Sequence, residues 1–266
     1  MLELLEYSFF RNALAGVLLL SIGAGILGTY IVTRRMVSIA GGITHACFGG
    51  LGLGYFLGFS PLLMASVFAV ASALGVQGLS WRGRVREDSA IAVIWALGMA
   101  VGVFFVFMTP GAVPELNSFL FGNILTITSA DLWAFALFTV ALTAFVMLLF
   151  DKIVACAFDR DFAAVNRLPV RTITTVMTVF VAVGIVLMIR CVGIMLLMSM
   201  LTMPQLTAEA ISRRYRDMMW ISVAVSLLTS AGGLLLTTAV NVPPAAVIVF
   251  LQVAVYAVVR LFSSSR

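Results

Sequence analysis

Long apolar runs separated by short polar stretches make up almost the whole chain. The runs are continuous and do not alternate, which is typical of membrane-spanning helices and not of barrel strands. A spanning helix needs about 20 predominantly apolar residues. The segments that meet this measure are 12–33, 41–59, 62–80, 89–108, 130–150, 172–189, 192–208, 218–240 and 243–260. The pattern predicts an all-α, polytopic membrane bundle of about nine transmembrane helices, or eight if one segment does not cross fully.

The basic residues give these segments an orientation, because Lys and Arg are retained on the cytoplasmic side of a membrane. The basic clusters lie at Arg34 and Arg35, 82–86, 152–171, 213–216, and Arg260 with Arg266. Two apolar segments separate each successive pair of clusters, as required if every cluster lies inside. With the first segment added, the N-terminus is expected outside and the C-terminus inside.

The composition agrees with a membrane protein and excludes several other classes. Of the 266 residues, 62% are hydrophobic and 10% charged, and the mean hydropathy is +1.16, whereas soluble domains are about half apolar and a quarter charged. The net charge of +5 comes from arginines in short loops and does not indicate nucleic-acid binding. The three cysteines lack CxxC spacing. We expect one transmembrane domain over residues 1–266.

The histidine of this sequence, His45, lies in a stretch that begins with an arginine pair and ends in a glycine-rich run, residues 34–54. Small residues let membrane helices approach closely. An ionisable residue inside a spanning segment is costly, which makes it a candidate functional residue. The functional interpretation is that His45 lines a path for an ion. A neutral histidine bonded to a backbone carbonyl at a close helix contact would account for the same pattern.

A second group of polar residues surrounds Pro204. A proline inside an apolar segment frees backbone polar groups, which is tolerated only where they face protein or water. Thr202 and Gln205 are therefore candidates for lining the same path. The nearby methionines wind around the helix and favour core packing over a soft-metal site. At the outer face, we expect Asp131 to be a solvated interface charge and Arg190 to extend toward the interface.

The longest polar segment contains FDRDFAAVNRLPV, residues 158–170. Its pattern predicts a short helix across the cytoplasmic face, bounded by Pro169 and suited to docking into a cleft of a partner. An ordinary solvated loop is the alternative. No GxxxxGK[ST] motif occurs in the sequence, so this chain is not expected to bind ATP through a P-loop.

Several motifs occur in a fixed order along the chain. They are RRMVSIAGGITHACFGG at 34–50, EDSAIAVIWALGMAVG at 87–102, SFLFGNIL at 118–125, FDRDFAAVNRLPV at 158–170, VGIMLLMSMLTMPQLTAEAI at 192–211 and NVPPAAVIV at 241–249. Together they resemble the ABC-3 family, the permease subunits of bacterial ABC importers for zinc, manganese or iron. The resemblance covers nearly the whole chain.

The resemblance implies a homodimeric permease in the bacterial cytoplasmic membrane, with ATPase subunits below and an extracytoplasmic metal-binding protein above. This chain would then be no enzyme and bind no cofactor, since ATP would bind the partner and the divalent metal would be the transported substrate. By the same analogy Asp159, Ala163 and Pro169 belong to the ATPase-coupling segment, in which Arg167 stands where the family has glycine.

The resemblance also bears on the ion path. The family has an aspartate four residues before its histidine, and this chain has Gly41 there. His45 remains the predicted metal ligand, with Thr44 and Cys47 as the nearest alternatives to the missing carboxylate.

Two other transport functions stay open. An ion-coupled secondary transporter usually shows paired intramembrane acids and inverted repeats, whereas here no spanning segment carries a carboxylate at mid-depth. An ABC permease for a metal chelate would share the family features but not the need for a bare-ion site. A non-transporting membrane scaffold, in which the coupling-like segment is accidental, is the third possibility.

Overall fold

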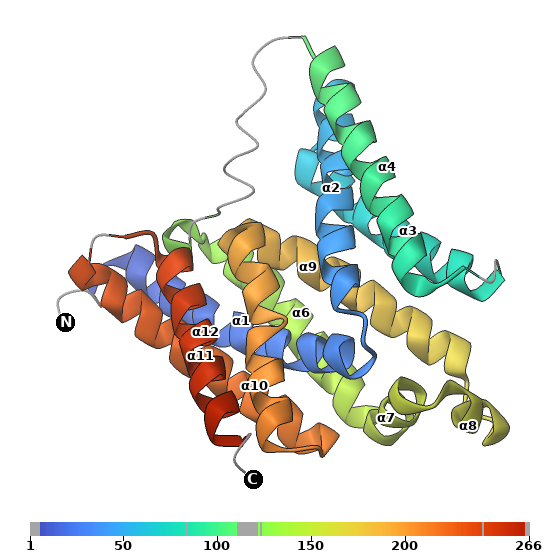
Figure 1. The fold of residues 1–266 in the computed structure, drawn as a ribbon. Coiled ribbons are helices and arrows are strands. Elements are labelled where there is room, and N and C mark those ends of the chain that lie inside the picture. Colours follow the sequence, from blue (N-terminus) through green and yellow to red (C-terminus); the bar gives the residue numbers. More distant parts are fainter. Residues whose placement is uncertain (1–5, 83–84, 111–121, 123, 241, 264–266) are drawn as a thin grey trace. The chain divides into compact units, whose positions relative to one another are not determined.

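Helices form every regular element in the described part of the chain (Figure 1). The computed structural model describes residues 6–82, 85–110, 122, 124–240 and 242–263. The elements are α1 (Ser8–Thr33), α2 (Val37–Leu57), α3 (Pro61–Arg82), α4 (Glu87–Met108), the 3₁₀ helix η2 (Ile124–Thr126), α6 (Ser129–Leu148), α7 (Phe150–Phe158), α8 (Arg160–Val165), α9 (Val170–Met200), α10 (Met203–Ile211), α11 (Tyr215–Val240) and α12 (Pro244–Ser263).

The contacts divide the chain into two units, which are described one at a time. The first unit comprises Met1–Thr33, Asn117–Phe150 and Leu187–Arg266. The second comprises Arg34–Leu116 and Asp151–Val186. The expectation of one domain over residues 1–266 stays a prediction.

Among the described residues, eight helical segments are long and apolar enough to cross a membrane. Seven of them match single predicted segments. The eighth, Val170–Ile211, has 42 residues and contains both predicted segments 172–189 and 192–208. Its backbone leaves the helical conformation at Gly193, where φ is 76° and ψ is 173°, so α9 consists of two helical pieces joined by a kink. This kink explains why a count of helices gives eight and the hydropathy pattern gives nine.

In the first unit, α1 is surrounded by other helices and buried along most of its length. Two of its glycines, Gly25 and Gly28, face α11 and α10. A methyl group at Gly25 would lie 3.0 Å from the backbone nitrogen of Val223, and one at Gly28 would overlap the amide of Gln205. The side chains of Leu20, Leu27 and Phe135 fill the core of this unit.

In the second unit, α2 packs against α3 and α4, as the ribbon in Figure 1 also shows. Here the backbones nearly touch. A methyl group at Gly98 would lie 2.5 Å from Ala46 Cα, and one at Gly102 would lie 2.5 Å from the Phe48 carbonyl oxygen. The close helix approach predicted from the small residues of this stretch is confirmed.

The predicted polar segment 151–171 contains two short helices. We expected one helix over 158–170, whereas the structure has α8 over Arg160–Val165, preceded by α7, which the sequence pattern did not predict. Pro169 lies after α8 and immediately before α9.

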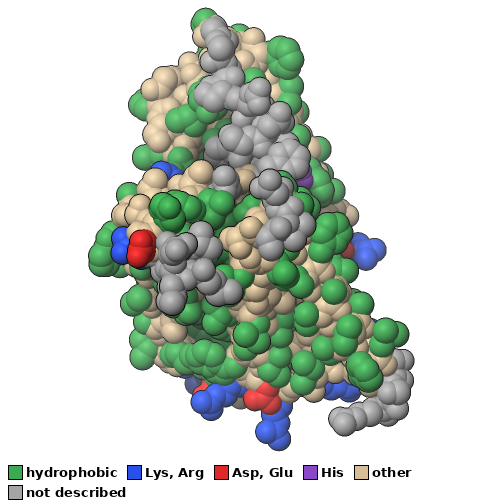
Figure 2. Space-filling model, turned by 90° about the vertical axis from the view of Figure 1, so that its left-hand side faces the viewer, with side chains coloured by type: hydrophobic (Ala, Val, Ile, Leu, Met, Phe, Trp, Pro, Cys, Tyr) green, Lys and Arg blue, Asp and Glu red, His purple; other side chains and the backbone are tan. Residues whose placement is uncertain are grey.

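The stretch 116–129 is too short and polar to span a membrane, and its sequence fits a re-entrant or hairpin piece; half of it falls on residues outside the described part. In the described portion, η2 is followed by α6, whose first turn has a capping box formed by Thr128 and Asp131. Asn12 of α1 donates to the carbonyl of Ile127, which ties this turn to the first helix. Figure 2 shows hydrophobic side chains spread over the described surface, with Lys and Arg side chains in a few small groups.

Candidate functional site

His45 lies half-buried on α2, with its ring against an aromatic side chain of α4. The imidazole stacks on the indole of Trp95 with ring centroids 4.5 Å apart and an interplanar angle of 4°. Its Nδ1 is buried and has no hydrogen-bond partner among the described residues. Because Nδ1 is buried, it is not open to an ion in this conformation, and the backbone-bonded alternative receives no support from it.

The neighbours of His45 differ in what they offer an ion. Gly41, one turn earlier, is buried and contributes no side chain. The Cys47 thiol is buried and donates to the carbonyl of Ile43 at 3.0 Å. Thr44 is fully buried, and its hydroxyl oxygen has no hydrogen-bond partner in the part of the chain that the structure describes. His45 and Thr44 thus have uncommitted polar atoms, whereas Cys47 is engaged with its own helix.

The structure places Thr202 and Gln205 in the other unit, at the break between α9 and α10. The Thr202 hydroxyl donates to the carbonyl of Met198 at 2.8 Å. Gln205 is fully buried, and its Nε2 donates to the carbonyls of Ala24 at 2.9 Å and Met200 at 3.2 Å. Gln205 therefore ties α10 to α1, and its Oε1 is without a partner among the described residues.

No group of three His, Cys, Asp or Glu side chains that could hold a metal ion occurs within the described residues. The uncommitted polar atoms at the predicted path are a single imidazole nitrogen, a hydroxyl and an amide oxygen. These isolated, buried atoms do not form a closed coordination site.

The predicted coupling segment has a well-defined local geometry. Asp159 caps α8, because its Oδ1 accepts from the backbone N–H groups of Asp161 at 3.0 Å and Phe162 at 2.9 Å. Ala163 is fully buried, so its side of α8 faces the rest of the protein. At the other end Arg167 has a φ of 56°.

The turn at Arg167 is a Schellman motif. The Arg167 N–H donates to the carbonyl of Ala164, and the Leu168 N–H donates to that of Ala163, both at 3.0 Å. This motif normally has glycine at the left-handed position. Arg167 stands where the family resemblance implies a glycine, and it adopts the left-handed conformation that this turn requires.

This segment has exposed apolar side chains. The exposed fractions are 61% for Phe158, 61% for Phe162 and 83% for Val165. Phe162 and Val165 are three residues apart in α8 and lie on one side of it. Phe158 is the last residue of α7 and precedes the extended residue Asp159. A surface of this kind suits contact with another protein.

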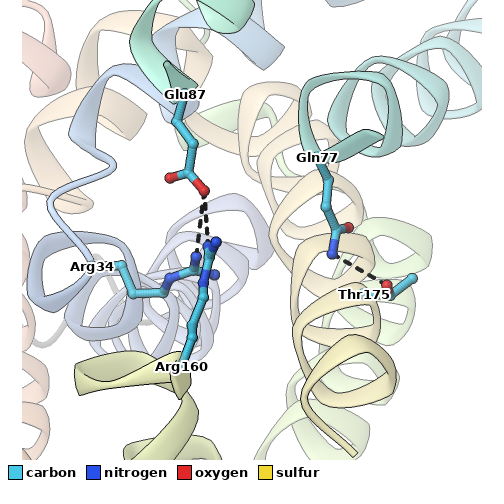
Figure 3. Close-up of polar contacts among 5 residues, drawn as sticks. All are labelled: Arg34, Gln77, Glu87, Arg160 and Thr175. Carbon is cyan, nitrogen blue, oxygen red and sulfur yellow. Dashed lines mark hydrogen bonds and ion pairs between the residues drawn. The ribbon is translucent and has the colours of Figure 1, made fainter. Parts of the chain in front are cut away.

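The structure also contains polar contacts that the sequence interpretation missed. Glu87 of α4 contacts both Arg34 and Arg160 (Figure 3). Arg190 forms an ion pair with Asp131 of the capping box, which corrects the expectation that both are separate interface charges. The sequence does show opposite charges at the ends of neighbouring segments, which indicates that ion pairs can form there. The spacing of these charges does not predict which residues pair with each other.

The chain matches the ABC 3 transport family over residues 6–263. It is 36% identical over 229 residues to a protein of Chlamydia pneumoniae described as "Probable metal transport system membrane protein", covering 84% of this chain and 78% of the relative. It is 27% identical to the manganese transport system membrane protein MntC of Halalkalibacterium halodurans, covering 99% and 90%.

Two further similarities agree with this match. The chain is 27% identical to a protein of Haemophilus influenzae described as "Probable iron transport system membrane protein", covering 100% of this chain and 98% of the relative. Among solved structures, a chain of PsaBC from Streptococcus pneumoniae in complex with Fab shares the fold, with a TM-score of 0.83, 24% identity and coverage of 96% and 92%. With eight apolar helices in its described part, the protein is a multi-pass protein of the bacterial cytoplasmic membrane, and it belongs to the ABC-3 family of transport permeases.

Proposed function

We propose that this chain is the permease subunit of an ATP-driven importer for a divalent metal ion: manganese, iron or zinc. Two copies would form the translocation path, a separate cytoplasmic ABC ATPase would hydrolyse ATP, and an extracytoplasmic metal-binding protein would deliver the ion. Family membership and the manganese and iron systems among the relatives support this proposal.

The observation that carries the coupling part of the proposal is the exposure of the apolar side chains Phe162 and Val165 on α8, with Phe158 just before it. A helix as short as α8 is not stable by its own hydrogen bonds in water. Here its two ends are fixed by the Asp159 cap and the turn at Arg167. A rigid, capped helix with an apolar side is suited to insertion into a cleft of a partner, and we assign that partner to the ATPase.

The ion path is proposed to include His45, Thr44, Cys47, Thr202 and Gln205. Imidazole nitrogen is a ligand for zinc and iron and is accepted by manganese. With Gly41 in place of a carboxylate, His45 offers one ligand without a charged partner. Weak and transient binding of this kind fits an ion that must leave the protein as readily as it enters.

The test is uptake by the complete complex of permease, ATPase and binding protein in proteoliposomes. We expect uptake of Mn²⁺, Fe²⁺ or Zn²⁺ that requires ATP on the ATPase side, and competition among the three identifies the substrate. Uptake that follows a proton or sodium gradient without ATP would replace the proposal by a secondary transporter. Uptake of a metal chelate alone, with no competition by the free ions, would replace it by a chelate permease. The absence of any ATPase that co-purifies with the chain would contradict the coupling assignment.

A further inference from the structure

Glu87 connects two parts of the second unit that are far apart in the sequence. Its Oε1 lies 2.8 Å from Nη2 of Arg160, at the start of α8, and 3.7 Å from Nη2 of Arg34, which precedes α2. Figure 3 shows both guanidinium groups directed at the same carboxylate oxygen. We call these three residues the Glu87 bridge.

The burial of the bridge indicates that it is a fixed contact. The Arg34 side chain is 4% exposed, and those of Glu87 and Arg160 are 29% and 33% exposed. A buried guanidinium needs a neighbouring anion, because its desolvation is otherwise uncompensated. Glu87 lies in the first turn of α4, where the helix dipole favours a carboxylate. The 2.8 Å contact to Arg160 is a charge-assisted hydrogen bond, the stronger class of such bonds.

Two more contacts attach the same region to the helices around it. Gln77 of α3 donates through Nε2 to the hydroxyl of Thr175 on α9 at 3.2 Å, and Figure 3 shows this contact beside the bridge. The Arg171 guanidinium lies 5.6 Å from the centre of the Trp81 ring. The cavity lined by Gln77 and the three residues of the bridge has about 10 Å³, room for roughly one water molecule. The attachment is therefore closely packed.

We propose that the Glu87 bridge is a positioning element that makes α8 move together with α4 and with the helices packed beside it, among them α2, which carries His45. The proposal rests on the function proposed above, in which α8 docks on the ATPase. A force applied to the exposed face of α8 would pass through Arg160 to Glu87 at the base of α4, and so to the helices packed on α4. Without the bridge, ATP hydrolysis would move α8 but would move the ion path less.

The first test compares transported metal per ATP hydrolysed in the complete complex, with Mn²⁺ as the first probe and Fe²⁺ and Zn²⁺ in parallel. We expect Glu87→Gln and Arg160→Gln to keep at least half of the ATPase rate and to lower the metal-to-ATP ratio at least fivefold. Arg160→Lys, which keeps the charge, should restore most of the ratio. The double variant should be no worse than Glu87→Gln alone, because that substitution already removes the charged contact with Arg160.

The matched control is Asp88→Asn, which removes a carboxylate from the same helical turn. Asp88 accepts a hydrogen bond from Ser38 and is not part of the bridge. It should leave the ratio unchanged. An unchanged ratio in Glu87→Gln, or a parallel fall of uptake and ATPase rate, would overturn the proposal. The absence of ATP-dependent uptake in the wild-type complex would instead contradict the proposed function.

A second test does not depend on the transported substance. Spin labels at Ala164→Cys on α8 and Val93→Cys on α4, both exposed positions, report the distance between the two elements. We expect one narrow distance distribution that is the same without nucleotide and with ADP trapped by vanadate after ATP hydrolysis. In the Glu87→Gln background the distribution should broaden or shift with nucleotide. A distribution that is unaffected by this substitution would contradict the bridge even if a variant complex transports poorly.

Discussion

Arg167 has a left-handed backbone conformation that costs a residue with a Cβ atom about 1–2 kcal/mol. Arg167→Gly should remove this cost, and after the larger conformational entropy of glycine in the unfolded chain a gain of about 0.5–1 kcal/mol remains. The measurement is hydrogen exchange at the amides of α8, which should slow about twofold to fivefold.

Ala164→Gly is the control for this prediction, because Ala164 lies inside α8 with helical geometry. It should destabilise the helix by about 1 kcal/mol. Faster exchange in Arg167→Gly would mean that the arginine side chain contributes more to the turn than its backbone conformation costs.

His45 provides the second prediction at the scale of single residues. His45→Ala removes an uncommitted imidazole nitrogen from the proposed path while leaving the backbone contacts of α2 in place. If the nitrogen lowers the barrier for the ion by about 1.4 kcal/mol, uptake should fall about tenfold. The measurement is metal uptake by cells, with the amount of assembled complex determined in parallel.

Trp95→Phe is the matched control, since it retains an aromatic partner for the histidine ring and keeps the imidazole. Uptake should stay near the wild-type level in this variant. Normal uptake by assembled His45→Ala would show that the histidine is a structural residue held by the stack on α4.

The single residues also show what sequence reasoning can reach. His45 stood out because an ionisable group inside an apolar segment is unusual. Its stacking partner could not be predicted, because Trp95 is 50 residues away in the sequence and the pattern of α4 does not select the side that faces α2. The ion pair of Arg190 with Asp131 was missed for the same reason.

The packing of α2 on α4 yields a prediction at the scale of elements. A methyl group at Gly102 would meet the backbone carbonyl group of Phe48, at 2.5 Å from the oxygen and 2.6 Å from the carbon. Backbone atoms in the middle of a helix cannot move aside cheaply, so Gly102→Ala should cost about 1–3 kcal/mol. We expect a lower melting temperature of the purified permease and less assembled complex.

Gly78 of α3 offers the control within the same unit. A methyl group there would meet no atom of the described residues within 4 Å. Gly78→Ala should be neutral or stabilising by about 0.5–1 kcal/mol, because alanine is the better helix former. Equal melting temperatures for the two alanine variants would contradict the close contact between α2 and α4.

The helices that could be predicted from the sequence are those that coincide with a long, continuous apolar run. Seven spanning helices matched single runs because a run of about 20 residues has few alternatives to a helix. The helix α7 was missed, since it has nine residues and buries only Ile153 and Cys156 in an otherwise polar stretch. The hydropathy pattern did not predict the kink at Gly193 itself. It showed only a short gap at residues 190–191, between two apolar segments.

At the scale of the whole molecule, the stretch Val170–Ile211 decides how many times the chain crosses the membrane. Its 42 residues would extend about 63 Å as a helix, twice the roughly 30 Å of the hydrocarbon core. Basic clusters precede and follow it, and both are expected on the cytoplasmic side. An even number of crossings is then required, so we predict that the stretch crosses twice and turns at the kink near Gly193.

This topology can be measured with a membrane-impermeant maleimide on single cysteines at Arg167 and Arg213, both exposed positions. The three native cysteines are buried, and burial raises the pKa of the Cys156 thiol, so background labelling at neutral pH should be low. Both engineered cysteines should be labelled only after the cells are permeabilised, whereas a cysteine at Thr126, on the predicted outer side, should react in intact cells. Labelling of positions 167 and 213 from opposite sides would mean a single crossing between them. The total would then be eight, and the two chain termini would lie on the same side of the membrane.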